Sequence, residues 1–320
     1  MTDSRFAIGL DIGGTFTDLV LLDERGGISL HKLLTTPDDP SRAALRGVEE
    51  LLASSGVAID QVDLLVHSTT LVTNALIQQR GARVGILTTK GFRDVLEMRD
   101  ERRYDIYDLF LEWPPPLVPR HRRIGISERI TRDGQVLAEP EEAEVVAALD
   151  QLAMEDVEAI AICFLHSYKD ATHEHKVAEI VRRHRPELPV TLSSDVAPVI
   201  GEYERTSTTV ADAYVRPLAQ AYLTRMEEGL KEMGFRGRFY LMLSGGGSAS
   251  IASARQYPIR LVESGPAAGT MAATLYGQLT ASDPILSFDM GGTTAKACVI
   301  EDGKPEAVNV LEVARAHRFK

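Results

Sequence analysis

A short motif of residues that suit phosphate binding occurs twice in the chain. Residues 11–15 read Asp-Ile-Gly-Gly-Thr, and residues 289–293, which lie 278 positions later, read Asp-Met-Gly-Gly-Thr. Glycines let the backbone approach a ligand without a Cβ in the way, and successive backbone N–H groups form a concave anion site. Each aspartate is expected to act through Mg²⁺ or a water molecule, because a carboxylate does not hold phosphate directly. Two such turns facing each other are expected to grip one polyphosphate from both sides.

The recurrence of the motif makes it informative. A single Gly-Gly after a strand is often only a hairpin turn. Here, each copy follows one apolar run and precedes another, which predicts a strand–turn–strand unit in both places. The chain has no Gly-x-x-x-x-Gly-Lys-Ser/Thr loop and no Gly-x-Gly-x-x-Gly after a strand, so the Walker and Rossmann alternatives lack their residues.

Composition sets the class of protein. The 320 residues suit two domains, and 44% hydrophobic with 25% charged residues is ordinary for a globular protein. A net charge of −11 argues against nucleic acid or an anionic membrane as the main partner. The two cysteines, Cys163 and Cys298, offer no metal-ligand spacing and suit a reducing compartment. With neither a signal-like start nor a membrane-length apolar stretch, the prediction is a cytoplasmic protein.

Regular elements are expected on both sides of the first turn. Residues 6–34 predict three antiparallel strands, and a helix follows that Asp39 caps, Pro40 begins and Gly56 ends. A short buried strand at 64–66 runs into His67, and the next helix is expected at 71–80. Strands and helices then alternate, which predicts an α/β fold with a mixed sheet.

The rest of the chain predicts a second domain with the logic of the first. An irregular, proline-rich and charged segment spans 91–132, regular alternation resumes after it, and a long helix is expected at 206–233. We place one domain at 1–199 and a second at 200–320. Ser264 and Gly265 open a helix of small residues whose first amides suit an anion. The sequence stops 27 residues after the second turn, so the second domain is expected to be incomplete.

Several longer runs resemble one family. Two Asp-x-Gly-Gly-Thr turns with α/β domains between them resemble the sugar kinase/Hsp70/actin superfamily, whose domains have a ribonuclease H-like mixed sheet. Within it, the chain is similar to the hydantoinase A/5-oxoprolinase family, of N-methylhydantoinase A type. The runs that carry this resemblance lie in the family's order along essentially the whole chain, at residues 10–18, 67–76, 88–98, 163–168, 202–209, 264–269 and 288–293.

The resemblance implies a reaction. Members use ATP and Mg²⁺ to phosphorylate the carbonyl oxygen of a cyclic amide or imide such as hydantoin or 5-oxoproline, and a B-type subunit generally completes ring opening. It implies catalytic and Mg²⁺-orienting roles for Asp11 and Asp289 and an active-site position for His67. Residues implied to hold the nucleotide are Gly13, Gly14, Thr15, Thr17, Gly265, Gly291, Gly292, Thr293 and Thr294. Residues proposed to face the substrate are Thr69, Thr70, Arg99 and Arg102.

Alternatives remain open at several of these positions. His67 suits a helix cap as well as an active site, the arginines suit a solvated surface, and Glu202 with Arg205 suits a structural ion pair. Strand alternation places either Thr17 or Asp18, but not both, toward the ligand. Lys296 follows the second turn where many members carry an aspartate.

Two other functions compete with the cyclic amidase. Related A-type chains serve ATP-dependent ketone carboxylases, and a need for bicarbonate would identify that activity. A non-catalytic nucleotide-binding module is the third possibility, which an ATP affinity measurement would separate.

Overall fold

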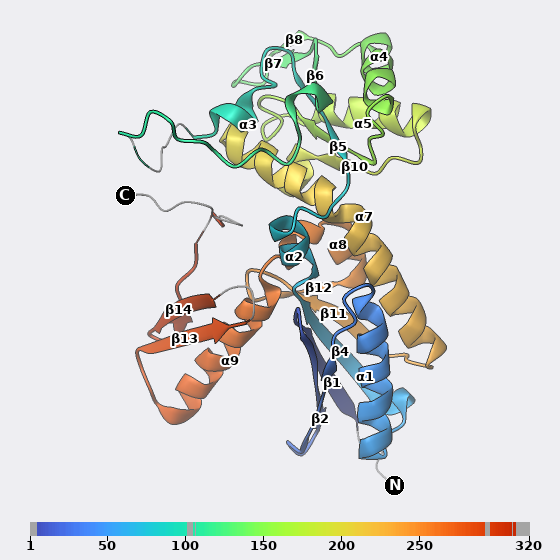
Figure 1. The fold of residues 1–320 in the computed structure, drawn as a ribbon, viewed down its shortest axis with the longest axis vertical. Helices are drawn as coiled ribbons and strands as arrows, with labels where there is room; N and C mark the ends of the chain where they lie inside the picture. Colours follow the sequence, from blue (N-terminus) through green and yellow to red (C-terminus); the bar gives the residue numbers. More distant parts are fainter. Residues whose placement is uncertain (1–4, 101–104, 106, 292–294, 309, 312–320) are drawn as a thin grey trace. The chain divides into compact units, whose positions relative to one another are not determined.

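The computed structural model describes residues 5–100, 105, 107–291, 295–308, 310 and 311. It divides into two compact units (Figure 1). The chain up to Ala75 and residues Ala219–Leu311 form the first unit, and Leu76–Leu218 forms the second. The first unit is therefore discontinuous in sequence, since the second is inserted between its two parts.

A six-stranded mixed sheet is the centre of the first unit. Its order is β12-β11-β4-β1-β2-β3. β1, β4 and β11 run parallel, whereas β2 is antiparallel to both of its neighbours. The strands are β1 (Phe6–Ile12), β2 (Phe16–Asp23), β3 (Ile28–Leu34), β4 (Val62–Thr69), β11 (Arg238–Met242) and β12 (Ser248–Ser250).

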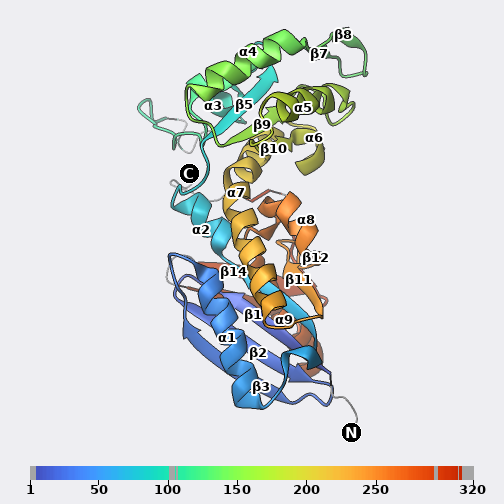
Figure 2. The same ribbon diagram turned by 90° about the vertical axis from the view of Figure 1, so that its right-hand side faces the viewer.

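Helix α1 (Pro40–Ser55) covers one face of this sheet (Figure 2). Asp39 caps its first turn by accepting from the Ser41 amide, and Gly56 ends it in the left-handed conformation at φ 65°. At Gly47 an added Cβ would lie 2.6 Å from a Leu19 methyl carbon, so glycine is what lets α1 pack this closely on β2.

Helix α9 (Ser264–Thr280) connects the main sheet with a second, smaller one. It contacts β4 and β11 and also the antiparallel strands β13 (Ile285–Met290), β14 (Ala295–Glu301) and β15 (Lys304–Pro305). The other helices with residues in this unit are α2 (Leu71–Ile77), α7 (Glu202–Glu232) and α8 (Ile251–Gln256).

The second unit has a parallel sheet of its own, in the order β10-β9-β5-β6. β5 and β9 are buried at every residue, as expected for central strands of a parallel sheet. Its strands are β5 (Val84–Thr89), β6 (Arg123–Ile126), β9 (Ala159–Cys163), β10 (Val190–Leu192) and the separate pair β7 (Arg129–Ile130) and β8 (Val136–Ala138). Its helices are α3 (Val95–Met98), α4 (Glu142–Ala153), α5 (Thr172–His184) and α6 (Ser193–Val196), together with the first part of α7.

The predicted α/β class with a mixed sheet is confirmed. The three-strand start, the caps of α1 and the long helix all occur as expected. The domain division at 199/200 stays a prediction, and the compact units follow different boundaries, because the chain returns to the first unit at Ala219. Burial raises the pKa of the Cys163 thiol to about 12, whereas Cys298 is only half-buried.

Candidate functional site

A row of polar side chains crosses one face of the main sheet. Strand register places Lys32, Asp18, Asp11 and Ser68 side by side on β3, β2, β1 and β4. The Lys32 ammonium lies 2.5 Å from an Asp18 oxygen, and the Ser68 hydroxyl donates to Asp11 at 2.5 Å. All four line a hollow of about 530 Å³ that also touches Ala268 of α9, a size typical of ligand sites.

The environment of Asp11 shifts the pKa of its carboxyl. Burial raises the pKa of its carboxyl, the bond from Ser68 lowers it, and the charges of Asp18 and Asp289 raise it further. The charge of the second motif's aspartate thus contributes to the environment of the first. Carboxylates that influence each other in this way attract a cation, which fits the predicted Mg²⁺ role of Asp11 and Asp289.

Hydrogen bonds to neighbouring residues hold the first glycine turn in place. The Gly13 amide donates to the Phe16 carbonyl, and the Thr35 hydroxyl donates to the Gly13 carbonyl. By contrast, the exposed Gly14 and Thr15 amides have no acceptor among the described residues. These amides are available to an oxyanion, and the phosphate contacts of Gly14 and Thr15 stay predictions.

Thr17 faces away from this site, which corrects the prediction that it contacts the nucleotide. Its side chain is fully buried, and its hydroxyl lies 3.0 Å from that of Thr35. Alternation along β2 therefore gives the ligand side to Asp18, directly opposite Asp11. Lys32 and Ser68 were missed by sequence reasoning, because only the pairing of four strands brings them into one row.

The start of α9 meets the end of β4. The Thr69 amide donates to the Ser264 hydroxyl, which in turn donates to the Thr69 carbonyl. A Cβ built on Gly265 would lie 3.5 Å from an Asp11 oxygen, so the first turn of α9 lies against that carboxylate. The positive end of a helix stabilises negative charge, and the negative charge beside it here is that of Asp11, so a nucleotide contact of Gly265 stays a prediction.

The second turn carries a different charge pattern. Asp289 pairs with Lys296 across β13 and β14, as Asp11 pairs with Asp18 in the first copy. The Lys296 ammonium forms an ion pair with Glu263, the left-handed residue that precedes α9. Gly291 is exposed just after β13. Gly292, Thr293 and Thr294 lie outside the described residues, so their nucleotide contacts stay predictions.

His67 lies beneath the site and not in it. The side chain is fully buried, its Nδ1 lies 3.1 Å from the Leu10 carbonyl and its Nε2 lies 2.6 Å from the Tyr222 hydroxyl. A carbonyl only accepts, so Nδ1 carries the proton and Nε2 accepts from Tyr222. We therefore assign His67 a structural role in place of the predicted catalytic one.

Stability should fall in acid because of His67. Burial lowers its pKa to about 4 from an ordinary value of 6.5. Between these values the unfolded chain binds a proton that the folded chain does not, so acidification from pH 7 to pH 4 should cost about 3 kcal/mol. Urea unfolding at several pH values checks this. His67→Gln keeps a donor and an acceptor but does not titrate, so its stability should vary less over that range; an equal loss in both proteins would contradict the prediction.

The predicted substrate residues have other contacts. The Thr69 hydroxyl accepts from the Leu71 amide at the start of α2, and the Thr70 hydroxyl donates to the Ile12 carbonyl at the end of β1. Arg99 belongs to the second unit, where it donates to the Pro114 carbonyl and lies over the Trp113 ring. Arg102 lies outside the described residues. Substrate roles for these four stay predictions.

Arg205 has neutral partners in the second unit. It is buried and donates to the carbonyls of Phe164 and Val199. These contacts are to backbone oxygens, and the expected ion pair with Glu202 is not among the contacts of the described residues.

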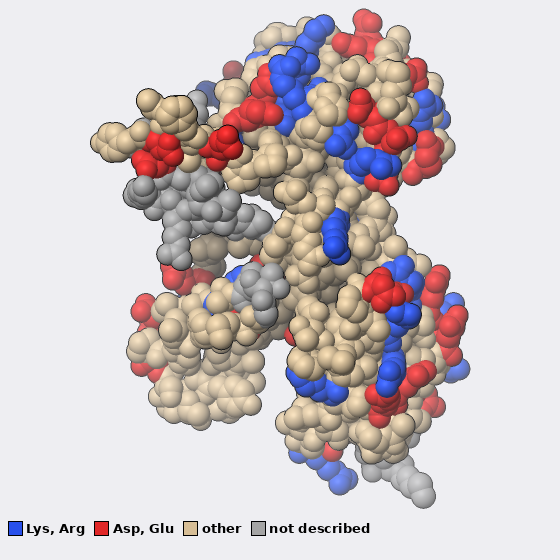
Figure 3. Space-filling view, in the orientation of Figure 1, with Lys and Arg blue, Asp and Glu red and all other residues tan. Residues whose placement is uncertain are grey.

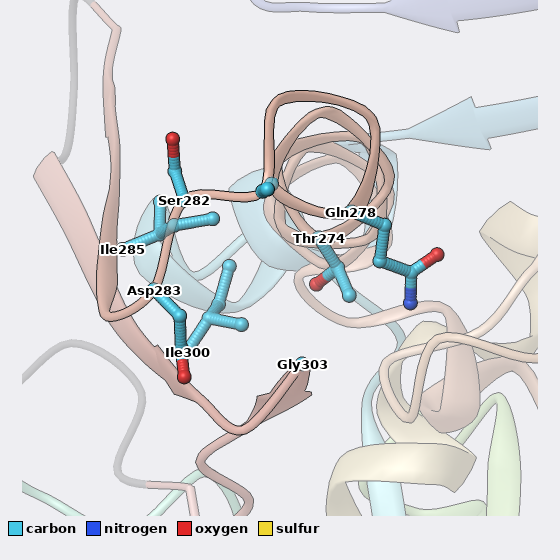
Figure 4. A pocket seen from close by; sticks show the side chains of 9 residues that line it. Thr274, Gln278, Ser282, Asp283, Ile285, Ile300 and Gly303 are labelled. Carbon is cyan, nitrogen blue, oxygen red and sulfur yellow. The ribbon is translucent and has the colours of Figure 1, made fainter.

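A second, smaller pocket of about 270 Å³ lies between the end of α9 and β13 and β14 (Figure 4). Asp283 is the one charged side chain in its lining, and it accepts from the Asp302 amide. Nothing in this lining is directed at an anion, so the hollow beside Asp11 is the candidate site.

Metal-binding capacity is modest. In the part of the chain that the structure describes, no three His, Cys, Asp or Glu side chains are grouped to hold a metal ion. Mg²⁺ commonly takes only one or two carboxylates plus phosphate oxygens and water, so Asp11 and Asp289 suit an ion that arrives with a nucleotide. None of the described helices has the length and hydropathy of a membrane span.

Two family models match the chain. The one described as the hydantoinase/oxoprolinase N-terminal region matches residues 7–185, and the one described as hydantoinase/oxoprolinase matches residues 205–318. Together they cover most of the chain and leave the first turn, β4, α9 and the second turn inside the matched regions.

Curated relatives support the same assignment. An uncharacterized protein of Methanocaldococcus jannaschii is 40% identical over 96% of this chain and 45% of its own length. Caprolactamase subunit alpha of Pseudomonas jessenii is 34% identical over 95% of this chain and 44% of the relative. The 5-oxoprolinase of Saccharomyces cerevisiae is 30% identical over 96% of this chain and 27% of the relative. The chain thus spans less than half the length of these relatives.

Solved structures share the fold. Nucleotide-free acetone carboxylase matches with a TM-score of 0.86 and 29% identity, over 94% of this chain and 44% of that one. The ATP-dependent caprolactamase of Pseudomonas jessenii matches with a TM-score of 0.82 and 35% identity, over 92% and 43% respectively.

Proposed function

Because the chain belongs to the hydantoinase/oxoprolinase family, we propose that it supplies the nucleotide site of an ATP-dependent enzyme that opens a cyclic amide or imide. The observation that carries this proposal is the placement of Asp11. Its carboxyl lies in a row of polar side chains, below a glycine turn with exposed amides, beside the start of α9 and within reach of the charge of Asp289.

The residues present fit a nucleotide with its metal. Gly14 and Thr15 have amides available to phosphate oxygens, and the first turn of α9 adds its dipole. Asp11 and Asp289 would hold Mg²⁺. When bound, ATP would supply the phosphoryl group that turns the amide carbonyl carbon into an electrophile that water can attack, after which the C–N bond of the ring breaks. This chain's part is positioning and charge neutralisation, which provide most of the catalysis in phosphoryl transfer.

A ketone carboxylase subunit is the second candidate. Acetone carboxylase gives a TM-score of 0.86, at least as high as that of caprolactamase, whereas the sequence identity is higher to caprolactamase. The fold does not discriminate between the two because both activities need the same activation of a carbonyl oxygen. We favour the cyclic amidase on identity, and we propose a B-type subunit as partner and the cytoplasm as location.

An ATPase screen tests the proposed function. The purified chain, alone and with a B-type subunit, is given Mg-ATP with caprolactam, 5-oxoproline or hydantoin, and separately with acetone and bicarbonate, and ADP release is followed. We expect release that depends on a cyclic amide and is indifferent to bicarbonate. Release that requires both the ketone and bicarbonate would identify the carboxylase. Nucleotide turnover with no dependence on either substrate class would contradict both activities.

A further inference from the structure

The outer face of the β13–β14 pair is apolar and uncovered. Leu286, Phe288 and Met290 alternate along β13 and are 64%, 63% and 72% exposed. Their partners on β14 are Val299, Ala297 and Ala295, in that order, and all three are exposed as well. We call these six residues the outer face. A contiguous apolar patch of this kind usually marks an interaction surface.

Charge is scarce around this surface. On the side seen in Figure 3, the surface over α9, β13 and β14 is mostly uncharged, whereas Lys, Arg, Asp and Glu are spread over α4 and α5. Helix α9 packs on the opposite face of these strands, beside Ile285 and Ile300, and has exposed apolar side chains of its own at Met271, Leu275, Tyr276 and Leu279. The partner of this surface should therefore present an apolar stripe.

The internal repeat identifies what such a partner looks like. Each residue of the outer face has a counterpart in the first copy, 278 positions earlier in the sequence. The counterparts of Leu286, Phe288 and Met290 are Ile8, Leu10 and Ile12, which are only 1–2% exposed. The counterparts of Val299, Ala297 and Ala295 are Leu21, Leu19 and Thr17, and all three of these are buried. The strand pairing is also the same, since Ile8 opposes Leu21 and Leu10 opposes Leu19. The outer face is thus the counterpart of a fully covered surface in the first copy.

Helix α1 covers that surface in the first copy. Its buried stripe includes Ala44, Val48 and Leu51, and Gly47 sits directly over Leu19. In the second copy Ala297 stands where Leu19 does, so more room is left and a covering helix needs no glycine there. The chemistry of the expected occupant is that of an amphipathic helix with a small-to-medium apolar stripe.

We propose that the outer face binds an amphipathic helix, in the way that β1 and β2 bind α1. The counterpart of α1 would begin at residue 318, which is 278 positions after Pro40, so it is not among the described residues. The relatives of this chain have more than half of their length outside the match. We assign the helix that covers the outer face to a polypeptide that corresponds to the unmatched part of these relatives. The proposal is independent of which reaction the protein catalyses.

Co-expression provides the test. The tagged 320-residue chain is co-expressed with the part of the Methanocaldococcus jannaschii relative that the match leaves uncovered, and copurification is quantified. Wild type should retain the partner, and Phe288→Glu should weaken binding at least about tenfold, because a charge then lies against an apolar stripe. Met154→Glu is the matched control, since Met154 is 78% exposed in the second unit, and it should bind as wild type does.

A single-chain fusion of the two parts gives a second measurement. Phe288→Glu should lower the unfolding temperature of the fusion by several degrees and leave that of the 320-residue chain unchanged, because Phe288 is exposed there. Equal effects in both proteins would overturn the proposal. So would self-association of the 320-residue chain that Phe288→Glu abolishes, since the occupant would then be a second copy.

Discussion

Asp11→Asn should weaken binding of Mg-ATP at least about tenfold and reduce nucleotide turnover by about 10³-fold, with no loss of stability. The substitution keeps the shape and an acceptor for the Ser68 hydroxyl, and it removes the charge that would hold Mg²⁺. Because burial raises the pKa of this carboxyl, the folded protein holds the charge at a cost. The asparagine variant should therefore unfold at the same temperature as wild type or at a higher one.

Isothermal titration with Mg-ATP and a thermal melt together check this prediction. Asp63→Asn is the matched control, because Asp63 is a half-exposed aspartate of the same unit whose partner is Arg5. It should bind nucleotide as wild type does. Unchanged affinity in Asp11→Asn would remove Asp11 from the nucleotide site, and a large loss of stability would mean that its carboxylate is a structural group.

Glu174→Ala should destabilise the second unit by about 4 kcal/mol and lower its unfolding temperature by about 10 °C. Glu174 is fully buried on α5. One carboxylate oxygen accepts from the Phe164 amide and the Ser193 hydroxyl, and the other accepts from the Ser194 amide. Alanine would leave the buried Phe164 amide and the half-buried Ser194 amide without this acceptor, would leave the Ser193 hydroxyl only the Ser167 hydroxyl as a partner, and would open a cavity.

The control for this substitution lies on the same helix. Glu179 is exposed on α5, so Glu179→Ala removes the same side chain from the same type of backbone. It should change the free energy of unfolding by no more than about 0.5 kcal/mol. Differential scanning calorimetry of the two variants beside wild type measures the difference, and similar melting of both would show that the buried carboxylate is not a structural anchor.

Local signals predicted much of this fold. Asp39, Pro40 and Gly56 bounded α1 correctly, since caps depend on only a few neighbouring residues. The repeated motif predicted that Asp11 and Asp289 serve one site, and the charge of Asp289 is among the causes that raise the pKa of Asp11. The boundaries of the compact units could not be predicted from local signals. The chain leaves the first unit at Ala75 and returns to it at Ala219, and no short sequence pattern at either position indicates this.

The positions predicted least well were those whose role depends on strand pairing or on distant partners. Thr17 and Asp18 are both polar neighbours in sequence, and only the pairing of β2 shows that Thr17 is buried whereas Asp18 lines the hollow beside Asp11. His67 lies near the carboxyl end of β4, where many active-site residues lie in other proteins. What makes it structural is Tyr222, which lies 155 positions away in the chain.

The exchange of Asp18 for Lys296 has a consequence for any ligand that both turns hold. A duplicated receptor with identical halves could accept a linear polyanion in either direction. Each copy has two carboxylates and one ammonium, but their order differs: Lys32 pairs with Asp18 in the first copy, whereas Lys296 stands opposite Asp289 and pairs with Glu263 in the second. The two ends of a polyanion held between the turns would therefore meet different arrangements of charge.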